Sequence, residues 1–190
     1  MTPGPELLLD RRALAEHVGR LGHEISRDHP DGLVLIGVLK GALIFLADLV
    51  RAIDVEVEID FLSISRYAPD SGRVRILKDT DVAIDGRDVV VVEDLVDTGL
   101  TLAYLLGHLA GQRPRHLRTC ALLDRPGRRI VPQKVEYVGR EIPDVFVLGY
   151  GMHWQDGYRN VDAVYVADRD AVVADPNCYV GALYGGGRAR

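Results

Sequence analysis

The stretch VVVVEDLVDTGLTL, residues 89–102, decides the fold. It opens with four valines, a run that is typical of a strand buried on both faces of a parallel sheet. Three acids follow at Glu93, Asp94 and Asp97, and the segment TGLT (98–101) then leads into an apolar pattern with helical spacing. A buried strand that passes through a polar loop into a helix is the repeating unit of α/β proteins. The stretch therefore predicts a mostly parallel sheet flanked by helices.

The first half of the chain repeats this alternation of helix and strand. Residues 10–26 space apolar side chains at helical intervals behind a capping aspartate, and residues 32–53 read as a buried strand, a short break and an apolar helix. Residues 55–67 alternate polar and apolar side chains like a half-exposed strand. After a turn, residues 73–79 form a shorter returning strand, so we expect this pair of strands to make a flap.

The second half supplies further strands. Residues 118–124 and 145–151 read as buried strands, and residues 101–111 form the helix that follows the valine run. The glycine-rich end of the chain, residues 184–190, is expected to be a flexible tail.

Composition narrows the possible functions. The chain has 190 residues, of which 47% are hydrophobic, and this is enough for one domain over residues 1–190 with a full core. A net charge of −5 argues against a nucleic acid partner, because such proteins cluster Lys and Arg against phosphates. Cys120 and Cys178 are far apart, and no apolar run is long enough to cross a membrane. We therefore expect a cytoplasmic protein without a disulfide framework, a zinc site or a membrane anchor.

The polar loop after the valines has the chemistry of a sugar phosphate site. A helix that opens there leaves backbone N–H groups unpaired, and Gly99 lets the chain turn closely, so a phosphate fits. Carboxylates next to a phosphate repel it unless they bind sugar hydroxyls or a divalent cation. A phosphorylated ribose satisfies both conditions, with Glu93 and Asp94 on its hydroxyls and Asp97 free for proton transfer. Alternatively, the three acids only cap a helix and face water.

Residues 89–101 closely resemble the phosphoribosyl pyrophosphate signature of the type I phosphoribosyltransferases. The segments VLKGALIFLADLVR (38–51), RVRILKD (73–79), LLDRPGRR (122–129) and VGREIPDVFVLGYG (138–151) resemble the hypoxanthine-guanine branch and extend the resemblance over nearly the whole chain. The resemblance implies the fold of that family, with a β flap and a small hood region. It also implies transfer of ribose 5-phosphate from phosphoribosyl pyrophosphate to N9 of a purine. Magnesium is the implied cofactor, and the family forms homodimers and homotetramers.

The resemblance assigns the donor site residue by residue. Asp97 matches the proposed general base for the purine proton, and Glu93 and Asp94 match the acids for ribose and magnesium. The Leu39-Lys40 peptide matches a cis peptide that binds pyrophosphate. The predicted donor site comprises Leu39, Lys40, Gly41, Glu93, Asp94, Asp97, Thr98, Gly99, Leu100, Thr101 and Arg159.

The resemblance also assigns a purine site. Phe146 matches a ring that stacks on the base, and Val147 matches a backbone group that contacts its edge, although core packing explains two apolar residues on a strand equally well. Arg125 replaces a lysine that donates to the purine 6-oxo group. Arginine still donates, but it is larger and forked. Alternatively, Arg125 faces solvent as part of a basic turn.

Two more departures from the family pattern concern the flap and the metal. Arg66-Tyr67 stands where the family usually has Ser-Tyr, so closure of the flap can differ in detail. His153 stands where the family has an aspartate that holds magnesium directly or through water. Imidazole is a poor ligand for a hard cation. We therefore expect Glu93 and Asp94 to be the main metal acids and the second metal site to be weak or filled by water.

The leading interpretation is a phosphoribosyltransferase that acts on hypoxanthine, guanine or both. One alternative is the same chemistry on an unusual base such as a deazapurine. Another is a regulator that keeps the fold to sense a nucleotide and bind nucleic acid. The acidic charge of the chain and the presence of Asp97 weigh against the regulator.

Overall fold

The computed structural model describes residues 4–65 and 75–185. Its main element is a six-stranded sheet in the order β4-β3-β2-β5-β6-β7, in which neighbours are parallel except β3 with β4. The bounds are β2 Leu33–Leu39, β3 Val57–Ile64, β4 Ile76–Lys78, β5 Asp88–Val96, β6 His116–Asp124 and β7 Tyr137–Glu141, with helices α1 Arg11–Asp28, α2 Leu43–Arg51 and α3 Leu100–Ala110 and the short 3-10 helix η1 Pro126–Arg128.

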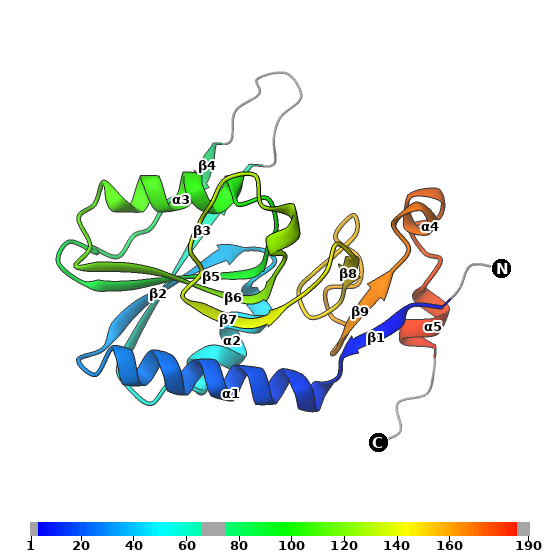
Figure 1. Cartoon of the computed structure of the whole chain (residues 1–190), viewed down its shortest axis with the longest axis horizontal. Helices are drawn as coiled ribbons and strands as arrows, with labels where there is room; N and C mark the ends of the chain where they lie inside the picture. The colour runs from blue at the N-terminus through cyan, green and yellow to red at the C-terminus, as the bar shows by residue number, and fades with distance from the viewer. Residues whose placement is uncertain (1–3, 66–74, 186–190) are drawn as a thin grey trace.

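Helices cover both faces of this sheet: α1 and α2 lie on one face and α3 on the other (Figure 1). Successive side chains of a strand point to opposite faces, and the valine run illustrates this. Val90 and Val92 pack in the cluster that contains the apolar side chains of α1 and α2. Val89 and Val91 pack with the apolar side chains of α3. One strand thus contributes to two cores, and the predicted parallel sheet flanked by helices is confirmed.

The first helix begins at the predicted cap. The Asp10 side chain accepts a hydrogen bond from the N–H of Ala13 at 2.7 Å, which satisfies one of the free donors at the start of α1. Leu14, Val18 and Ile25 lie on the buried face of α1, so the helical spacing that predicted this element also determines which side faces the sheet.

A second, antiparallel sheet stands beside the first one, in the order β1-β9-β8 (Figure 1). Residues 145–151, predicted as a buried strand, contribute β8 to this second sheet rather than to the main one. A strand pattern identifies an extended segment but not its partner, and the sequence reasoning did not identify β1, β7 or β9. The small sheet and two short helices occupy the place of the hood that the resemblance implies; they are β1 Glu6–Leu9, β8 Phe146–Leu148, β9 Val164–Ala167, α4 Arg169–Ala174 and α5 Val180–Tyr184.

The two sheets share one hydrophobic cluster. Leu9 of β1, Val147 of β8 and Val164 of β9 belong to the same cluster as Leu14 and Leu21 of α1. This shared core ties the small sheet to the main one through α1, which passes directly from β1 to the main sheet.

The end of the chain differs from its prediction in one detail. Tyr184, where the flexible tail was predicted to start, ends helix α5 and donates a hydrogen bond to Asn160 at 2.8 Å. Gly185 is the C-cap of this helix, and residues 186–190 of the predicted tail lie outside the described residues. Within the described ranges, no helix has the length and apolar content that crossing a membrane requires.

Candidate active site

Two parallel neighbours, β2 and β5, bring two predicted loops together at the carboxyl edge of the main sheet. The peptide between Leu39 and Lys40 is cis, as predicted. A Cβ atom on Gly41 would lie 2.2 Å from Oδ2 of Asp94, and a Cβ atom on Gly151 would lie 2.1 Å from the Gly41 carbonyl oxygen. The turn after β2 is therefore held between the end of β5 and the segment after β8, and only glycine fits at its centre.

The strand β5 is longer than the valine run. It continues to Val96, so Glu93 and Asp94 lie on the strand itself rather than in the predicted loop. The loop is reduced to residues 97–99, and α3 begins directly after it. Gly99 caps α3 with φ of +81°, a left-handed conformation that favours glycine. Because this cap has no side chain, the first N–H groups of α3 can face a ligand, as a phosphate site requires.

Two cavities adjoin these loops, and together they include every residue of the predicted donor site. The smaller, of about 210 Å³, is lined by Asp97, Gly99 and their neighbours on β5 and α3. The larger has a volume of about 820 Å³. Its walls include the predicted residues Leu39, Lys40, Gly41, Glu93, Asp94, Thr98, Leu100, Thr101, His153 and Arg159. The predicted purine residues Arg125, Phe146 and Val147 line neither cavity.

The two acids on β5 are electrostatically unusual. Burial raises the pKa of Glu93 well above its usual range, and the adjacent Asp94 raises it further. Burial also raises the pKa of Asp94, against a hydrogen bond from the Leu95 N–H and the positive charge of Arg159. Buried carboxyl groups with raised pKa values are characteristic of functional sites, where a cation or a substrate completes their surroundings. This burial contradicts the alternative that the acids only cap a helix and face water.

Arginines from the turn after β6 surround Asp97. Its Oδ1 atom lies 3.0 Å from Nε of Arg128 and 3.4 Å from Nη1 of Arg125. Its backbone carbonyl accepts a hydrogen bond from Arg129. Arg128 also pairs with Asp144 at 3.1 Å. The turn that the resemblance assigns to the base thus contacts the predicted general base directly.

Arg125 does not face solvent, so that alternative is wrong. Its side chain is 7% exposed and donates a hydrogen bond to the carbonyl of Val145. Its Nε atom is buried without a hydrogen-bond partner among the described residues. Val145 directly precedes β8, so the guanidinium lies between Asp97 and the strand that carries the other predicted purine residues.

Those other purine residues make packing contacts. Phe146 meets Trp154 edge to face with the ring centroids 5.9 Å apart. Val147 lies in the main hydrophobic core. Their roles toward a base remain predictions.

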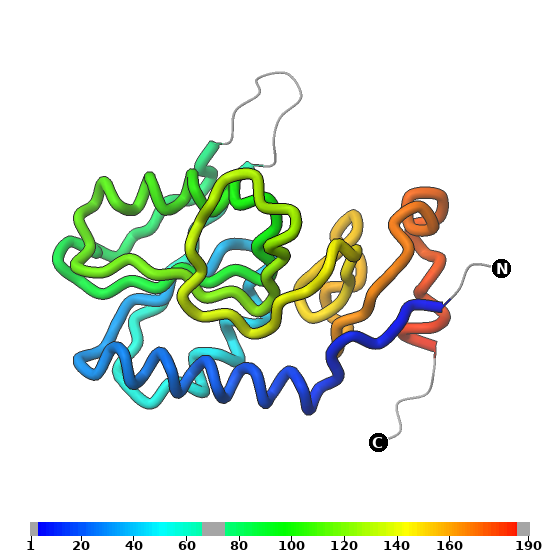
Figure 2. The backbone as a smooth tube through the Cα atoms, viewed as in Figure 1, coloured from blue at the N-terminus to red at the C-terminus, as the bar shows by residue number. Residues whose placement is uncertain are grey.

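The segment between β8 and β9, which Figure 2 traces between the two sheets, contributes to the wall of the larger cavity. His153 accepts a hydrogen bond at Nδ1 from the N–H of Asp156, at 3.0 Å. The Asp156 carboxylate pairs with Arg159 at 2.8 Å and with Lys40 at 3.4 Å. The hydrogen bond from Arg159, followed by the charge of Lys40, lowers the pKa of Asp156.

Comparison with known proteins identifies the family of this chain. Residues 6–155 match the family described as phosphoribosyl transferase domain. The chain belongs to this family. Among curated proteins, it is 39% identical to the hypoxanthine-guanine phosphoribosyltransferase of Bacillus subtilis over 85% of this chain and 92% of that one. It is 42% identical to the enzyme of the same name from Mycobacterium avium, over 85% of each chain.

Solved structures of other members superpose on most of this chain. A hypoxanthine-guanine phosphoribosyltransferase from Bacillus anthracis, with HEPES in its active site, is 42% identical, with a TM-score of 0.83 over 88% of this chain and 100% of that one. The hypoxanthine phosphoribosyltransferase of Trypanosoma cruzi in complex with the product IMP is 37% identical, with a TM-score of 0.82 over 87% of this chain and 95% of that one. The predicted family fold is therefore confirmed.

In this phosphoribosyltransferase, sequence reasoning missed one charged residue of the larger cavity. Asp156 bridges Lys40 and Arg159, the two cations assigned to pyrophosphate. Its signal in the sequence was the spacing of three residues between Asp156 and Arg159, which places an acid and a base on one turn of the chain. The predicted flap residues Arg66 and Tyr67 lie outside the described residues.

Proposed function

We propose that this protein transfers ribose 5-phosphate from phosphoribosyl pyrophosphate to N9 of a 6-oxopurine, hypoxanthine, guanine or both, and releases pyrophosphate. The observation that carries the proposal is the junction of β5 with α3, where the buried Glu93 and the partly buried Asp94 precede a helix start that has no side-chain cap. Relatives at about 40% identity bear the hypoxanthine-guanine name, and the Trypanosoma cruzi relative holds IMP. Both findings support hypoxanthine as an acceptor.

Different residues of the site bind different parts of phosphoribosyl pyrophosphate. The 5'-phosphate occupies the N-terminus of α3, where backbone N–H groups from the loop 97–99 and the hydroxyls of Thr98 and Thr101 face the ligand. Glu93 and Asp94 accept hydrogen bonds from the ribose hydroxyls. Lys40 and Arg159 line the same cavity, and we assign them to the pyrophosphate.

The reaction exchanges one bond at C1 of the ribose. The bond from C1 to the pyrophosphate oxygen breaks, and pyrophosphate leaves with the electron pair. The bond from C1 to N9 of the purine forms, and Asp97 accepts the proton that the base loses. Arg125, 3.4 Å from Asp97, donates to O6 and orients the base. Proton transfer by a positioned carboxylate accelerates such reactions by roughly 10² to 10⁴.

The acids on β5 fit magnesium. Mg²⁺ takes oxygen ligands and is usually held by one or two carboxylates together with substrate oxygens and water. Glu93 and Asp94 supply such oxygens, and the described residues contain no group of three or more metal-binding side chains that would form a complete protein cage. Bound magnesium would neutralise charge on the leaving pyrophosphate. His153 is a poor candidate for this site, because imidazole is a poor ligand for a hard cation and its Nδ1 atom accepts a backbone hydrogen bond.

The two alternatives gain no support. No described residue of the site is specific for a deazapurine over an ordinary purine. The relatives quoted above are named for hypoxanthine and guanine. A nucleic acid regulator would need a basic face, whereas the chain carries a net charge of −5. A homodimer or homotetramer and a cytoplasmic location stay predictions, and light scattering on the purified protein tests the first of them.

Pyrophosphate release from a panel of bases tests the proposal. The protein is incubated with phosphoribosyl pyrophosphate, magnesium and one base at a time, chosen from hypoxanthine, guanine, adenine, a 7-deazapurine and uracil. We expect release with hypoxanthine, guanine or both, and at least tenfold less with adenine. Release with the deazapurine alone would replace the acceptor, and no release with any base would refute phosphoribosyl transfer. Retention on heparin that falls steeply with salt would revive the regulator.

A further inference from the structure

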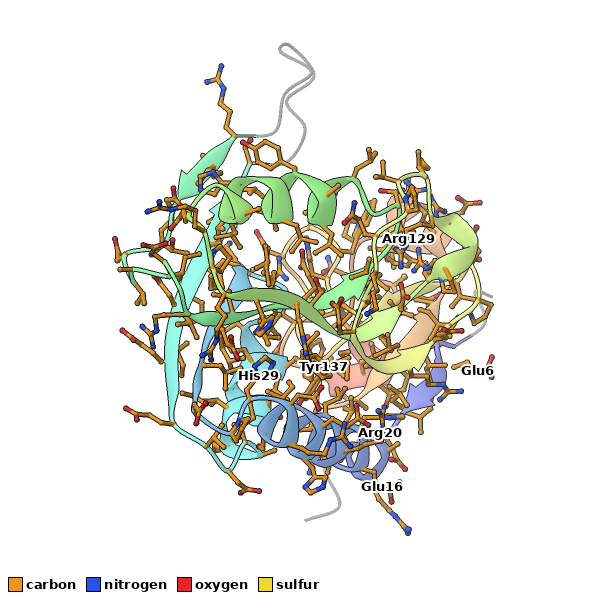
Figure 3. The ribbon with its side chains drawn as sticks, turned by 60° about the vertical axis from the view of Figure 1, so that its left-hand side comes forward. Glu6, Glu16, Arg20, His29, Arg129 and Tyr137 are labelled. Carbon is orange, nitrogen blue, oxygen red and sulfur yellow. The ribbon has the colours of Figure 1, made fainter. Side chains whose placement is uncertain are left out.

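Arg129 is a partly buried arginine beside the phosphate loop that the reaction described above does not use. It follows the helix η1 and lies on the α3 side of the sheet, whereas His29 and Tyr137 lie on the α1 side (Figure 3). Its side chain is 13% exposed, and one end of the guanidinium donates to the Asp124 carboxylate at the end of β6. The other end donates to the backbone carbonyl of Asp97.

The next carbonyl of the loop is held from the same side. The carbonyl of Thr98 accepts hydrogen bonds from the N–H groups of Ile130 at 2.9 Å and Val131 at 3.1 Å. Two successive carbonyls of the phosphate loop thus point at the segment 129–131. This arrangement needs glycine at position 99, because a Cβ atom there would lie 2.9 Å from Cδ of Arg129 and 2.4 Å from the Val131 carbonyl oxygen.

The orientation of these carbonyls determines the orientation of the N–H groups. In a trans peptide the C=O and N–H of one unit point in opposite directions. The carbonyl of Asp97 shares its peptide with the N–H of Thr98, and the carbonyl of Thr98 shares its peptide with the N–H of Gly99. With both carbonyls held toward residues 129–131, both N–H groups are directed away from that segment. These are N–H groups of the loop that receives the 5'-phosphate.

We propose that Arg129 is a positioning residue for the donor substrate: by anchoring the Asp97 carbonyl to Asp124, it orients the loop N–H groups toward the 5'-phosphate. The proposal rests on the phosphoribosyl transfer proposed above. Arg129 itself is not placed in contact with substrate. It acts through the peptide that follows Asp97, and its effect should therefore appear in binding of the phosphate rather than in recognition of the base.

If Arg129 only stabilised the fold, its replacement would have a different effect. An arginine paired with a buried acid can stabilise the fold without affecting any ligand, and its loss would then lower stability only. Arg118 is a matched control, because it pairs with Asp28 at 2.7 Å and also contacts Tyr137, far from the phosphate loop. Arg129→Met and Arg118→Met each remove a partly buried arginine from an acid. Only the first removes a donor from a carbonyl of the loop.

Calorimetric measurement of ribose 5-phosphate binding tests the proposal without requiring turnover. We expect Arg129→Met to weaken ribose 5-phosphate binding and to raise the KM for phosphoribosyl pyrophosphate by about tenfold, as loss of a hydrogen bond to a binding element does. The KM for the purine at saturating donor should change less than twofold. Arg129→Lys should recover part of the loss, because one ammonium group can reach one of the two acceptors. Arg118→Met should leave both constants at the parent values.

Two further measurements keep the outcome decisive. If Arg129→Met does not fold, Asp124→Asn tests the same anchor from its other end, and we expect a smaller rise in the same donor KM. Unchanged donor binding in Arg129→Met or Asp124→Asn, or an equal loss in Arg118→Met, would overturn the positioning role. Failure of the parent protein to bind ribose 5-phosphate would instead overturn the proposed function.

Discussion

Oδ1 of Asp97 lies 3.0 Å from Nε of Arg128. In this arrangement the predicted general base is already in contact with a cation before any purine is present, and Arg125 lies only slightly farther from the same oxygen. Oδ1 of Asp97 is nevertheless buried without a hydrogen-bond partner among the described residues. Under the proposed function, Arg125 donates to O6 of a 6-oxopurine, and the Asp97 carboxylate is available for the proton of the base.

Asp97→Asn tests the general base. The amide keeps the shape of the side chain but cannot accept the proton, so we expect turnover to fall by roughly 10²-fold or more. Binding of phosphoribosyl pyrophosphate should change little, because the loop backbone is unaltered. Steady-state kinetics with hypoxanthine measures both effects, and Asp85→Asn on the surface is the control. Near-normal turnover in Asp97→Asn would remove this residue from the mechanism.

Substitutions of Arg125 test whether this residue selects the purine base. Adenine presents an amino donor where a 6-oxopurine presents an acceptor, and a buried pair of unsatisfied donors costs about 1–3 kcal/mol. We expect the parent protein to prefer hypoxanthine over adenine by tenfold or more in kcat/KM. Arg125→Lys should keep or improve the use of 6-oxopurines, and Arg125→Met should lose most of the preference. If Arg125→Lys abolishes activity with both 6-oxopurines, or the parent accepts adenine equally well, then Arg125 does not read O6.

His153→Asp tests the second metal site. An aspartate offers oxygen ligands in place of an imidazole whose Nδ1 already accepts a backbone hydrogen bond. We expect the variant to reach half-maximal activity at a lower magnesium concentration. His23→Asp, on the exposed face of α1, should leave the magnesium titration unchanged. An unaltered titration in His153→Asp would mean that residue 153 does not face the second metal site.

The Glu93→Gln variant tests whether burial of the Glu93 carboxylate lowers the stability of the ligand-free protein. A carboxyl whose folded pKa is raised favours folding when protonated, and this contribution is lost as pH rises through that raised pKa. The ligand-free parent is therefore penalised at pH 7, and Glu93→Gln should raise Tm, by about 2–4 °C for each kcal/mol gained. The gap should narrow as pH falls toward the ordinary glutamate pKa of about 4.3.

Calorimetric or fluorescence melting curves between pH 4 and 8 measure this difference, with Glu16→Gln on the surface as the control. Magnesium and phosphoribosyl pyrophosphate together should stabilise the parent more than Glu93→Gln, since the ligands use the carboxylate. A variant that is less stable than the parent at pH 7 would contradict the penalty.

The valine run and the polar residues that follow it were enough to predict the fold class of this protein. Four successive apolar β-branched residues are typical of a strand covered on both faces, and TGLT after three acids indicates a loop and a helix start. Local rules of this kind need no partner. For the same reason the helix cap at Asp10 and the break after β2 were predictable from the sequence, whereas most members of the predicted donor site were assigned by resemblance to the family.

Only the tertiary structure decided which strands pair and what surrounds each charge. β8 carries an ordinary strand pattern, yet its partner in the second sheet is β9, because pairing depends on where the rest of the chain lies. The buried position of Arg125, its approach to Asp97 and the anchoring of the phosphate loop by Arg129 join residues about 30 positions apart. Asp156 reaches Lys40 across more than 100 positions. A sequence pattern reports the nature of each charge, whereas its pKa and its partner depend on distance and burial, and those are properties of the folded chain.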